Sequence, residues 1–412
     1  MTKSTALVII GKTHVRLTFS ARPVANMLEL EKIAPAVKEF AREKADVLRG
    51  LGDQFSVANR VINDICSDVN RAHSRIEKAR TSWLIADFLE PLDVAHQCPT
   101  CPHPHAVIAV DGSQIAPGKH EIALCFLINT AAVVIYYGTS ERPYAETKPE
   151  LCYTEDKLYE DYAGRRVQIA DKFLGIRRTL AESDHLEQTL REVASKGIPA
   201  VALWDGSLIR WTLESEPTDY KNRVLAQYLK VFETAREKRI PIVGYISDPG
   251  SKDFVNSLRI MLCPDEQVDC DKCGREPPRP CDAVNQLSDG VIFERRLEPG
   301  CRSALFTSRS KILAQYGEHE VQACYLNLGQ EVARLEIPKW VAEDDELLNM
   351  VHAVCYDQAE KGRGYPVALS QAHERAVVTA KDKAEFFELI KHFFVKHGVR
   401  VSHSLKRISK GF

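Results

Sequence analysis

Two apolar runs of the sequence end in the same tripeptide, and this repetition constrains the fold more than any other feature. The first reads His-Ala-Val-Ile-Ala-Val-Asp-Gly-Ser over residues 105–113, and the second reads Pro-Ala-Val-Ala-Leu-Trp-Asp-Gly-Ser over residues 199–207. A short, continuously apolar run is typical of a strand that is covered on both faces. Each run therefore predicts a buried strand with a carboxylate, Asp111 or Asp205, at the point where the strand emerges.

A glycine follows each of these carboxylates, and we expect Gly112 and Gly206 to let the chain turn sharply. If the two strands lie side by side, Asp111 and Asp205 come to one place, where a divalent cation would offset their mutual repulsion. Asp-Gly-Ser is also ordinary turn chemistry after a strand. Because two copies follow matched strands, the pattern favours a metal site.

Length, charge and cysteine usage exclude several classes of protein. The chain has 412 residues, enough for a large core and two structural units. Its formal net charge of -2 gives no global basic field, so any contact with nucleic acid must come from local patches. We find no secretory signal and no run of about 18 apolar residues, so we expect a cytoplasmic protein without a membrane span. Twelve cysteines in a reducing compartment suggest metal binding rather than disulfides.

The N-terminal region, residues 1–95, is predicted to differ from the rest of the chain. Alternating residues in 6–20 predict a small hairpin, and helical spacing from about residue 26 to 92 predicts two or three long helices. These helices could form a coiled coil that dimerises, or an ordinary helical layer on the core. Proline and cysteine interrupt residues 93–105, which predicts a domain boundary there and a second domain over 96–412.

The order of elements after the first Asp-Gly-Ser predicts the fold class. We expect a two-stranded hairpin within 122–137, interrupted at Asn129-Thr130, and a long helix over about 161–195. Helices follow at 220–238, 251–262 and 343–361, and strands at 240–247, 321–328 and 332–337. Three antiparallel strands, then alternating helices and strands with acidic residues at strand ends, is the order of the ribonuclease-H-like fold. The class is therefore α/β, a mixed sheet flanked by helices.

A Cys-rich insertion occupies residues 263–281, with the spacing Cys263-x6-Cys270-x2-Cys273-x7-Cys281. A Cys-x2-Cys pair with two flanking cysteines in a loop rich in proline indicates a zinc site. The spacing also permits an iron–sulfur cluster, or four thiols that bind nothing. A loop without a hydrophobic core of its own needs a cross-link or a bound ion to hold its conformation, which favours zinc. Cys98 and Cys101 form a second, weaker pair.

Several short segments resemble the NurA nuclease family in its longer bacterial form, from about residue 105 to the C-terminus. They are Val-Asp-Gly-Ser, Arg178-x3-Glu182, Leu-Trp-Asp-Gly-Ser-Leu, Gly-Tyr-Ile-Ser-Asp-Pro-Gly-Ser with Val-Asn-Ser-Leu-Arg, Glu331-Val-Ala-Arg, and Gly-Tyr-Pro-Val-Ala-Leu with Ala-His-Glu. Their order and number, rather than any one segment, carry the resemblance. The Cys-rich insertion and the N-terminal helices lie outside the shorter archaeal pattern.

The resemblance implies a ribonuclease-H-like fold and manganese-dependent DNA degradation, with 5′ to 3′ exonuclease and single-strand endonuclease action. It further implies resection of DNA ends in double-strand break repair, a HerA-type hexameric ATPase as partner, and a homodimer. Asp111 and Asp205 then correspond to the family's strand-end metal ligands and His373 to its later ligand. Glu182 is our choice for the helix carboxylate, with Glu187 as the alternative.

The chemistry of phosphodiester hydrolysis agrees with these residue types. Two cations about 3.5–4 Å apart can activate water at neutral pH and neutralise the developing charge, so we expect two metal ions per site. Carboxylates together with one imidazole suit Mn²⁺. Cationic side chains must then hold the scissile strand, and the candidates are Arg178, Arg259, Lys406 and Arg407. The last two belong to a basic C-terminal tail, residues 391–412, which is either a phosphate contact or a solvated helix face.

Two interpretations from other classes stay open. The first is a non-catalytic module that binds DNA ends or docks on an ATPase, with a structural zinc loop and a vestigial pair of aspartates. It predicts metal at the thiols alone. The second is a metal-dependent phosphohydrolase of small molecules, which a comparison of nucleotide and DNA hydrolysis would separate from a nuclease.

Overall fold

The computed structural model describes residues 4–10, 13–19, 29–118 and 123–399, so Lys406 and Arg407 of the basic tail lie outside the described residues. The chain divides into two compact units, Met1–Asp53 and Gln54–Phe412. In the first unit, β1 (Ser4–Ile10) and β2 (Thr13–Phe19) pair as an antiparallel hairpin, which confirms the hairpin predicted there.

The division between the units falls inside a helix rather than near residue 95. α1 (Leu30–Ser67) is followed directly by α2 (Val69–Lys78), whose first turn is capped by Asp68. In the C-terminal half of α1, Ala58, Ile62 and Ile65 are buried, so this part of the helix belongs to the core of the second unit. β3 (Ala86–Phe88) also joins the main sheet, by pairing with β11.

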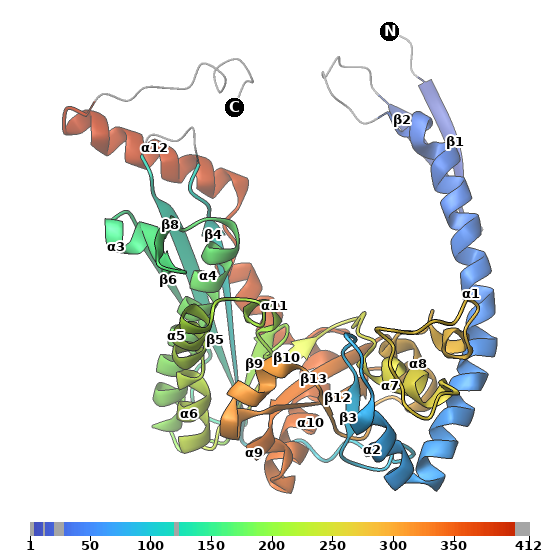
Figure 1. The fold of residues 1–412 in the computed structure, drawn as a ribbon. Coiled ribbons are helices and arrows are strands. Elements are labelled where there is room, and N and C mark those ends of the chain that lie inside the picture. The colour runs from blue at the N-terminus through green and yellow to red at the C-terminus, as the bar shows by residue number, and fades with distance from the viewer. Residues whose placement is uncertain (1–3, 11–12, 20–28, 119–122, 400–412) are drawn as a thin grey trace. The chain divides into compact units, whose positions relative to one another are not determined.

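Nine strands of the described chain form the main sheet, in the spatial order β3-β11-β12-β13-β10-β9-β4-β5-β6 (Figure 1). β9 pairs in parallel with both β4 and β10, whereas β4, β5 and β6 pair antiparallel in succession. This is the topology of the ribonuclease-H-like fold and confirms the predicted class. The remaining strands are β4 (His105–Ile115), β5 (Phe126–Tyr137), β6 (Tyr144–Cys152), β9 (Ala200–Asp205), β10 (Ile242–Ile246), β11 (Phe306–Ser308), β12 (Val321–Asn327) and β13 (Val332–Pro338).

The predicted helices of the second unit are present, with several differences. The helix expected over 220–238 is two helices that meet at Leu229, and the helices Asp289–Arg296 and Ala380–Lys396 are additional. A small hairpin of β7 (Tyr159–Tyr162) and β8 (Arg165–Gln168) takes the place of the expected first turns of the long helix. That helix therefore begins only at Asp171. The helices are α3 (Glu155–Leu158), α4 (Asp171–Ala194), α5 (Thr218–Tyr228), α6 (Lys230–Glu237), α7 (Asp253–Leu262), α8 (Asp289–Arg296), α9 (Lys339–Ala342), α10 (Asp345–Lys361), α11 (Val367–Ala376) and α12 (Ala380–Lys396). None of the described helices is long and apolar enough to cross a membrane.

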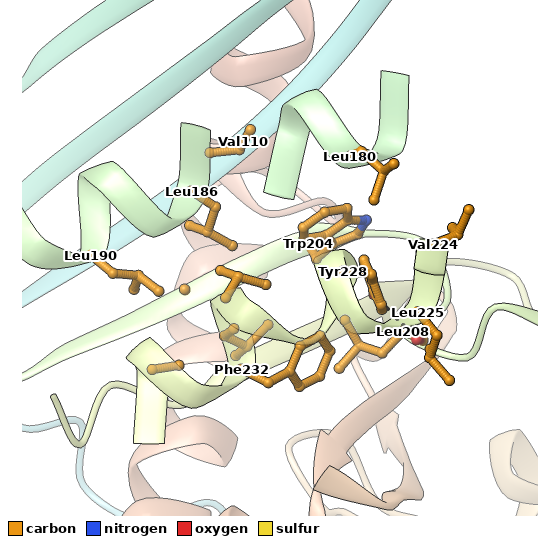
Figure 2. Close-up of a cluster of buried hydrophobic side chains, with 14 of the residues drawn as sticks. Val110, Leu180, Leu186, Leu190, Trp204, Leu208, Val224, Leu225, Tyr228 and Phe232 are labelled. Carbon is orange, nitrogen blue, oxygen red and sulfur yellow. Dashed lines mark hydrogen bonds between the residues drawn. The ribbon is translucent and has the colours of Figure 1, made fainter. Parts of the chain in front are cut away.

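Two apolar layers cover the faces of the sheet at β4 and β9. On one face, Ile108, Val110 and Trp204 pack with residues of α4, α5 and α6. Figure 2 shows Val110 and Trp204 in this layer. On the other face, the intervening residues, such as Ala109 and Leu203, pack with residues of α10 and α11. Side chains of a strand alternate between faces, so this alternation also decides which helices each strand-end residue meets.

The prediction of a hairpin within residues 122–137 is wrong, because β5 continues through Asn129 and Thr130 and makes its hairpin with β6 instead. Thr130 Oγ1 lies 2.9 Å from Nδ1 of His185 on α4. Asn129 Nδ2 donates a hydrogen bond of 2.8 Å to the carbonyl oxygen of Ala376 on α11. Since neighbouring helices satisfy both polar side chains, the strand tolerates them in its interior.

Candidate active site

Asp111 and Asp205 occupy neighbouring positions on the parallel strands β4 and β9. The residues just before them, Val110 and Trp204, are partners in the strand register. Because side chains alternate along a strand, both carboxylates lie on the same face as Ala109 and Leu203, the face covered by α10 and α11. The two copies of the repeated motif therefore bring their aspartates together, as expected.

The first Asp-Gly-Ser is not a turn. β4 continues through Gly112 to Ile115, with Gly112 paired to Thr130 of β5, so the expected sharp turn at Gly112 is wrong. A Cβ at Gly112 would lie 2.5 Å from Glu182 Oε1, which means that this glycine makes room for the side chain from α4. The second glycine does match the prediction, since the φ of Gly206 is +93° directly after β9.

His373 reaches Asp111 from α11. Its Nδ1 lies 2.8 Å from Asp111 Oδ2, and its side chain is 61% exposed. One turn later, the carbonyl oxygen of Ala376 accepts hydrogen bonds from Ser113 Oγ on β4 and Asn129 Nδ2 on β5. These bonds attach the end of α11 to the sheet and so hold His373 beside the strand that carries Asp111.

Glu182 approaches the same place from α4, on the opposite face of the sheet. The residue is only 7% exposed, and its Oε1 lies 3.2 Å from Arg178 Nε. Burial raises the pKa of Glu182 to about 7, and the charges of Asp111 and Asp205 act in the same direction, while Arg178 and Arg210 oppose them. A carboxyl group in such surroundings is strongly stabilised in its charged form by a cation.

The alternative helix carboxylate, Glu187, points elsewhere. Its Oε1 accepts hydrogen bonds from Arg191 at 2.7 Å and from Thr234 Oγ1 on α6 at 3.2 Å. The structure therefore brings Glu182, and not Glu187, close to the two aspartates.

Tyr365 is part of the site, although it is not among the site residues predicted from the sequence. Desolvation raises the pKa of the Asp205 carboxyl group, and the charge of Asp111 adds to the increase. The hydroxyl group of Tyr365 donates a hydrogen bond to Asp205, which opposes the increase. Tyr365 lies in the Gly-Tyr-Pro-Val-Ala-Leu segment just before His373, so the sequence did contain a signal for it.

A buried ionic network holds the turn that follows Asp205. Glu336 Oε2 accepts hydrogen bonds from Ser207 Oγ at 2.7 Å and from the backbone N–H of Leu208 at 2.9 Å. Glu336 Oε1 in turn lies 3.0 Å from Arg334 Nε, and Arg334 also pairs with Asp253 at 3.1 Å. Breaking one partner of a buried ion pair leaves an uncompensated charge, so this network fixes the turn firmly.

Cationic side chains line a cavity of about 320 Å³ beside Glu182, between α4 and the segment after β9. Arg178 and Arg210 are among its lining residues, and so are Lys172 and Glu216, which pair with each other at 2.7 Å. The guanidinium of Arg210 lies 4.8 Å from the centre of the Tyr228 ring, which positions it through a cation–π contact. Arg178 was proposed from the sequence, whereas Arg210, five residues after Asp205, was missed.

The structure does not bring Arg259 to these residues. Its guanidinium stacks 3.8 Å from the centre of the Trp83 ring, its Nε donates to the carbonyl oxygen of Cys281, and its side chain is only 15% exposed. Arg259 thus joins the Cys-rich insertion to the segment between α2 and β3, and its own guanidinium is not open to a DNA strand.

The four cysteines predicted to bind zinc are not gathered as closely as the ligands of one ion. Among the described residues, no three sulfur atoms of Cys263, Cys270, Cys273 and Cys281 lie within 4.8 Å of one another. Burial raises the pKa of the Cys270 thiol, and neighbouring Cys263 and Cys281 contribute to the increase, so these cysteines do share one region. A zinc site in the insertion stays a prediction.

The NurA domain family matches residues 105–378, more than half of the chain. The chain belongs to this family. The matched region contains Asp111, Glu182, Asp205 and His373, and it excludes the N-terminal helices and the basic tail of this NurA-family protein. No protein with a curated description matches the sequence.

Three solved structures are similar to this NurA-family chain. The NurA nuclease from Sulfolobus solfataricus is 14% identical, with 90% of this chain and 98% of that chain covered and a TM-score of 0.49. A structure of NurA with manganese is 10% identical, with coverage of 71% and 89% and a TM-score of 0.30. The catalytic domain of human endonuclease V is 15% identical, with coverage of 74% and 93% and a TM-score of 0.32.

Proposed function

We propose that this NurA-family protein is a manganese-dependent deoxyribonuclease whose metal ligands and catalytic groups are Asp111, Glu182, Asp205 and His373. The observation that carries the proposal is the convergence of these side chains from β4, α4, β9 and α11. Membership of a nuclease family supports the same conclusion. A buried carboxyl group beside two others is unfavourable without a cation, which favours a working metal site over a vestigial one.

The donor atoms fit manganese. Three carboxylates and one imidazole form an oxygen-rich set with a single nitrogen, which suits Mn²⁺. The buried Glu182 and its two acidic neighbours repel one another when all three are ionised, and the pKa of Glu182 is raised accordingly. Two divalent ions at Asp111, Glu182, Asp205 and His373 would remove this repulsion.

The protein's own residues then position the reaction. Bound metal ions would supply a water that is nucleophilic at neutral pH and neutralise charge that develops on the phosphorane. The His373–Asp111 bond and the Tyr365–Asp205 bond orient the two aspartates before substrate arrives. Arg178 and Arg210, in the cavity beside Glu182, would hold phosphates of the scissile strand.

The finer features of the activity follow from the family resemblance. We propose 5′ to 3′ exonuclease and single-strand endonuclease action on DNA ends in double-strand break repair, fed by a HerA-type hexameric ATPase. We also propose a homodimer. The apolar residues Leu30, Ile33, Val37 and Phe40 of α1 are exposed at helical spacing, which supports dimerisation through a coiled coil.

A cleavage assay tests the proposal. DNA labelled at the 5′ or the 3′ end is incubated with Mn²⁺, Mg²⁺ or EDTA, and nucleotides are offered in parallel. We expect DNA degradation with Mn²⁺, none with EDTA, and early release of the 5′ label. The matched inactive variant is Asp205→Asn. Cleavage that persists in EDTA or in this variant would contradict the proposal, and hydrolysis of nucleotides but not DNA would support a small-molecule phosphohydrolase instead.

A further inference from the structure

A second group of metal-ligand side chains lies on the segment that leads into β4. One ligand atom each from Cys101, His105 and Asp357 lies within 4.8 Å of the other two, the one such group found in the described part of the chain. Cys101 Sγ is 4.0 Å from His105 Nε2. In tetrahedral zinc sites the ordinary bond lengths place a sulfur and a nitrogen ligand about 3.6 Å apart, so little movement would be needed.

His105 is oriented as a metal-binding histidine is. Its Nδ1 lies 2.6 Å from the carbonyl oxygen of Pro102, which can only accept, so Nδ1 carries the hydrogen and Nε2 has a free lone pair. The ring stacks on Tyr137, with 4.8 Å between ring centres. Burial lowers the pKa of His105, which favours the neutral ring that binds metal ions.

Asp357 on α10 supplies an oxygen that lacks a partner. Its Oδ1 pairs with Lys361, whereas its Oδ2 is buried and has no hydrogen-bond partner. A buried carboxylate oxygen without a partner is unfavourable, and a cation would remove the penalty.

Cys98 completes a set of four. It is half-buried, and the charges of Cys101 and Asp357 add to the desolvation that raises the pKa of its thiol to about 11. Its sulfur lies outside the close group of three and donates a hydrogen bond of 3.5 Å to the carbonyl oxygen of Pro99, so Cys98 would turn toward the other ligands when an ion binds. The spacing Cys98-x2-Cys101 is that of a zinc knuckle.

We propose that Cys98, Cys101, His105 and Asp357 form a structural zinc site, separate from the manganese site and from the Cys-rich insertion. Four protein ligands leave no open position, which is typical of structural rather than catalytic zinc. Both thiols lose a proton when the ion binds. Two thiolates, one carboxylate and Zn²⁺ carry a net charge of -1, and Lys361 beside Asp357 would offset it.

The site would join two parts of the fold that support catalysis. Cys98 and Cys101 lie just before β4, which carries Asp111, and Asp357 lies on α10, one of the helices that cover the face of Asp111. Zinc would therefore fix the start of the catalytic strand against the helical layer.

Metal analysis of the full-length protein tests this proposal. Cobalt is added to metal-free protein, since sulfur-to-cobalt charge-transfer bands report thiolate ligands and do not arise from a carboxylate–imidazole site. Compared with the parent, Cys101→Ser should lose one equivalent of thiolate-bound cobalt, and Asp357→Asn should bind that equivalent at least about 10-fold more weakly. Zinc content after purification should fall by one equivalent in Cys101→Ser.

The matched control is Cys273→Ser, which removes a thiol of the Cys-rich insertion and should leave this equivalent in place. The nearly isosteric Asp357→Asn decides the question if Cys101→Ser does not fold. The proposal is overturned if the parent binds no cobalt through thiolates, or if Cys101→Ser and Asp357→Asn bind it as the parent does. Loss of the metal in Cys273→Ser alone would assign it to the insertion and also overturn the proposal.

Discussion

His373 Nδ1 lies 2.8 Å from Asp111 Oδ2, although 262 residues separate the two along the chain. The contact joins the helix α11 to the central strand β4, and hydrogen bonds from Ser113 and Asn129 to Ala376 support it. Packing of the fold therefore assembles the candidate metal ligands before any ion binds. Ligands that packing and hydrogen bonds already hold in place have less conformational freedom to lose when an ion binds.

Removing either strand carboxylate should abolish cleavage without unfolding the protein. Asp111→Ala and Asp205→Ala each delete a charge from a crowded acidic site, so the metal-free fold should be as stable as the parent or more stable. We expect Mn²⁺-dependent cleavage to fall by more than about 100-fold, as for other groups that stabilise charge in the transition state. Cleavage rates and thermal unfolding measure the two effects. Near-parental cleavage by both variants would rule out the two-metal interpretation.

Glu182→Gln should stabilise the metal-free protein at high pH. The folded-state pKa of Glu182, about 7, lies above its ordinary value of 4.5, so ionisation destabilises the fold as the pH rises from 4.5 to 7. The variant should gain on the order of 1–3 kcal/mol above pH 7 and nothing below pH 4.5. It should also lose most cleavage activity and the stabilisation by Mn²⁺. Glu187→Gln is the control, and a larger loss of activity there would move the ligand to Glu187.

Gly112→Ala should impair the site while the strand persists. The new Cβ would lie 2.5 Å from Glu182 Oε1 and 3.1 Å from Arg178 Cγ, so the glutamate must withdraw. We expect weaker binding of Mn²⁺, measured by calorimetry, and partial recovery in the double variant with Glu182→Asp, whose side chain is shorter. Gly175→Ala on α4 has nothing within 4 Å and should instead stabilise the helix by about 0.5–1 kcal/mol. Unchanged Mn²⁺ affinity in Gly112→Ala would show that Glu182 does not contribute a ligand.

Arg210→Gln should weaken DNA binding uniformly across sequences and reduce its dependence on salt. A side chain that neutralises one phosphate contributes about one unit to the slope of log affinity against log salt concentration. Arg259→Gln is the comparison, because Arg259 is engaged with Trp83 and should leave the slope unchanged. Salt titrations of both variants, on DNA in the presence of Ca²⁺ or EDTA to prevent cleavage, measure the slopes. An effect confined to Arg259→Gln would place the DNA path along the Cys-rich insertion.

The basic tail gives a separate prediction. Replacing Lys406 and Arg407 with alanine should weaken binding to DNA of any sequence and lower the salt slope by up to about two units, while Mn²⁺ affinity stays the same. An identical slope for parent and variant would mean that the tail makes no phosphate contact and that the strand runs past Arg178 and Arg210 instead.

The sequence predicted the strands and their aspartates well, because a continuous apolar run followed by a carboxylate has few structural solutions. The predicted turn at Gly112 is wrong, because glycine occurs both in sharp turns and where another side chain approaches the backbone closely. Only the position of Glu182 distinguishes the two cases. The turn predicted at Asn129-Thr130 is wrong for a related reason, because the hydrogen-bond partners of these two side chains lie on helices that are distant in sequence. Arg210 acts through its proximity to Glu182, which no local pattern encodes. Tyr365 lies in a segment that the sequence does single out, but only the structure shows that its hydroxyl group reaches Asp205.

The order of residues within one dipeptide of β4 has a consequence of its own. Asp111 faces α11 and Gly112 faces α4, because adjacent residues of a strand project to opposite sides. Transposing the two letters to Gly-Asp would preserve the composition, the net charge and the length of the chain. The carboxylate would then collide with Glu182, and His373 would lose its acceptor. The chemistry of this site therefore depends on whether a residue occupies an odd or an even position along the strand as much as on which residue it is.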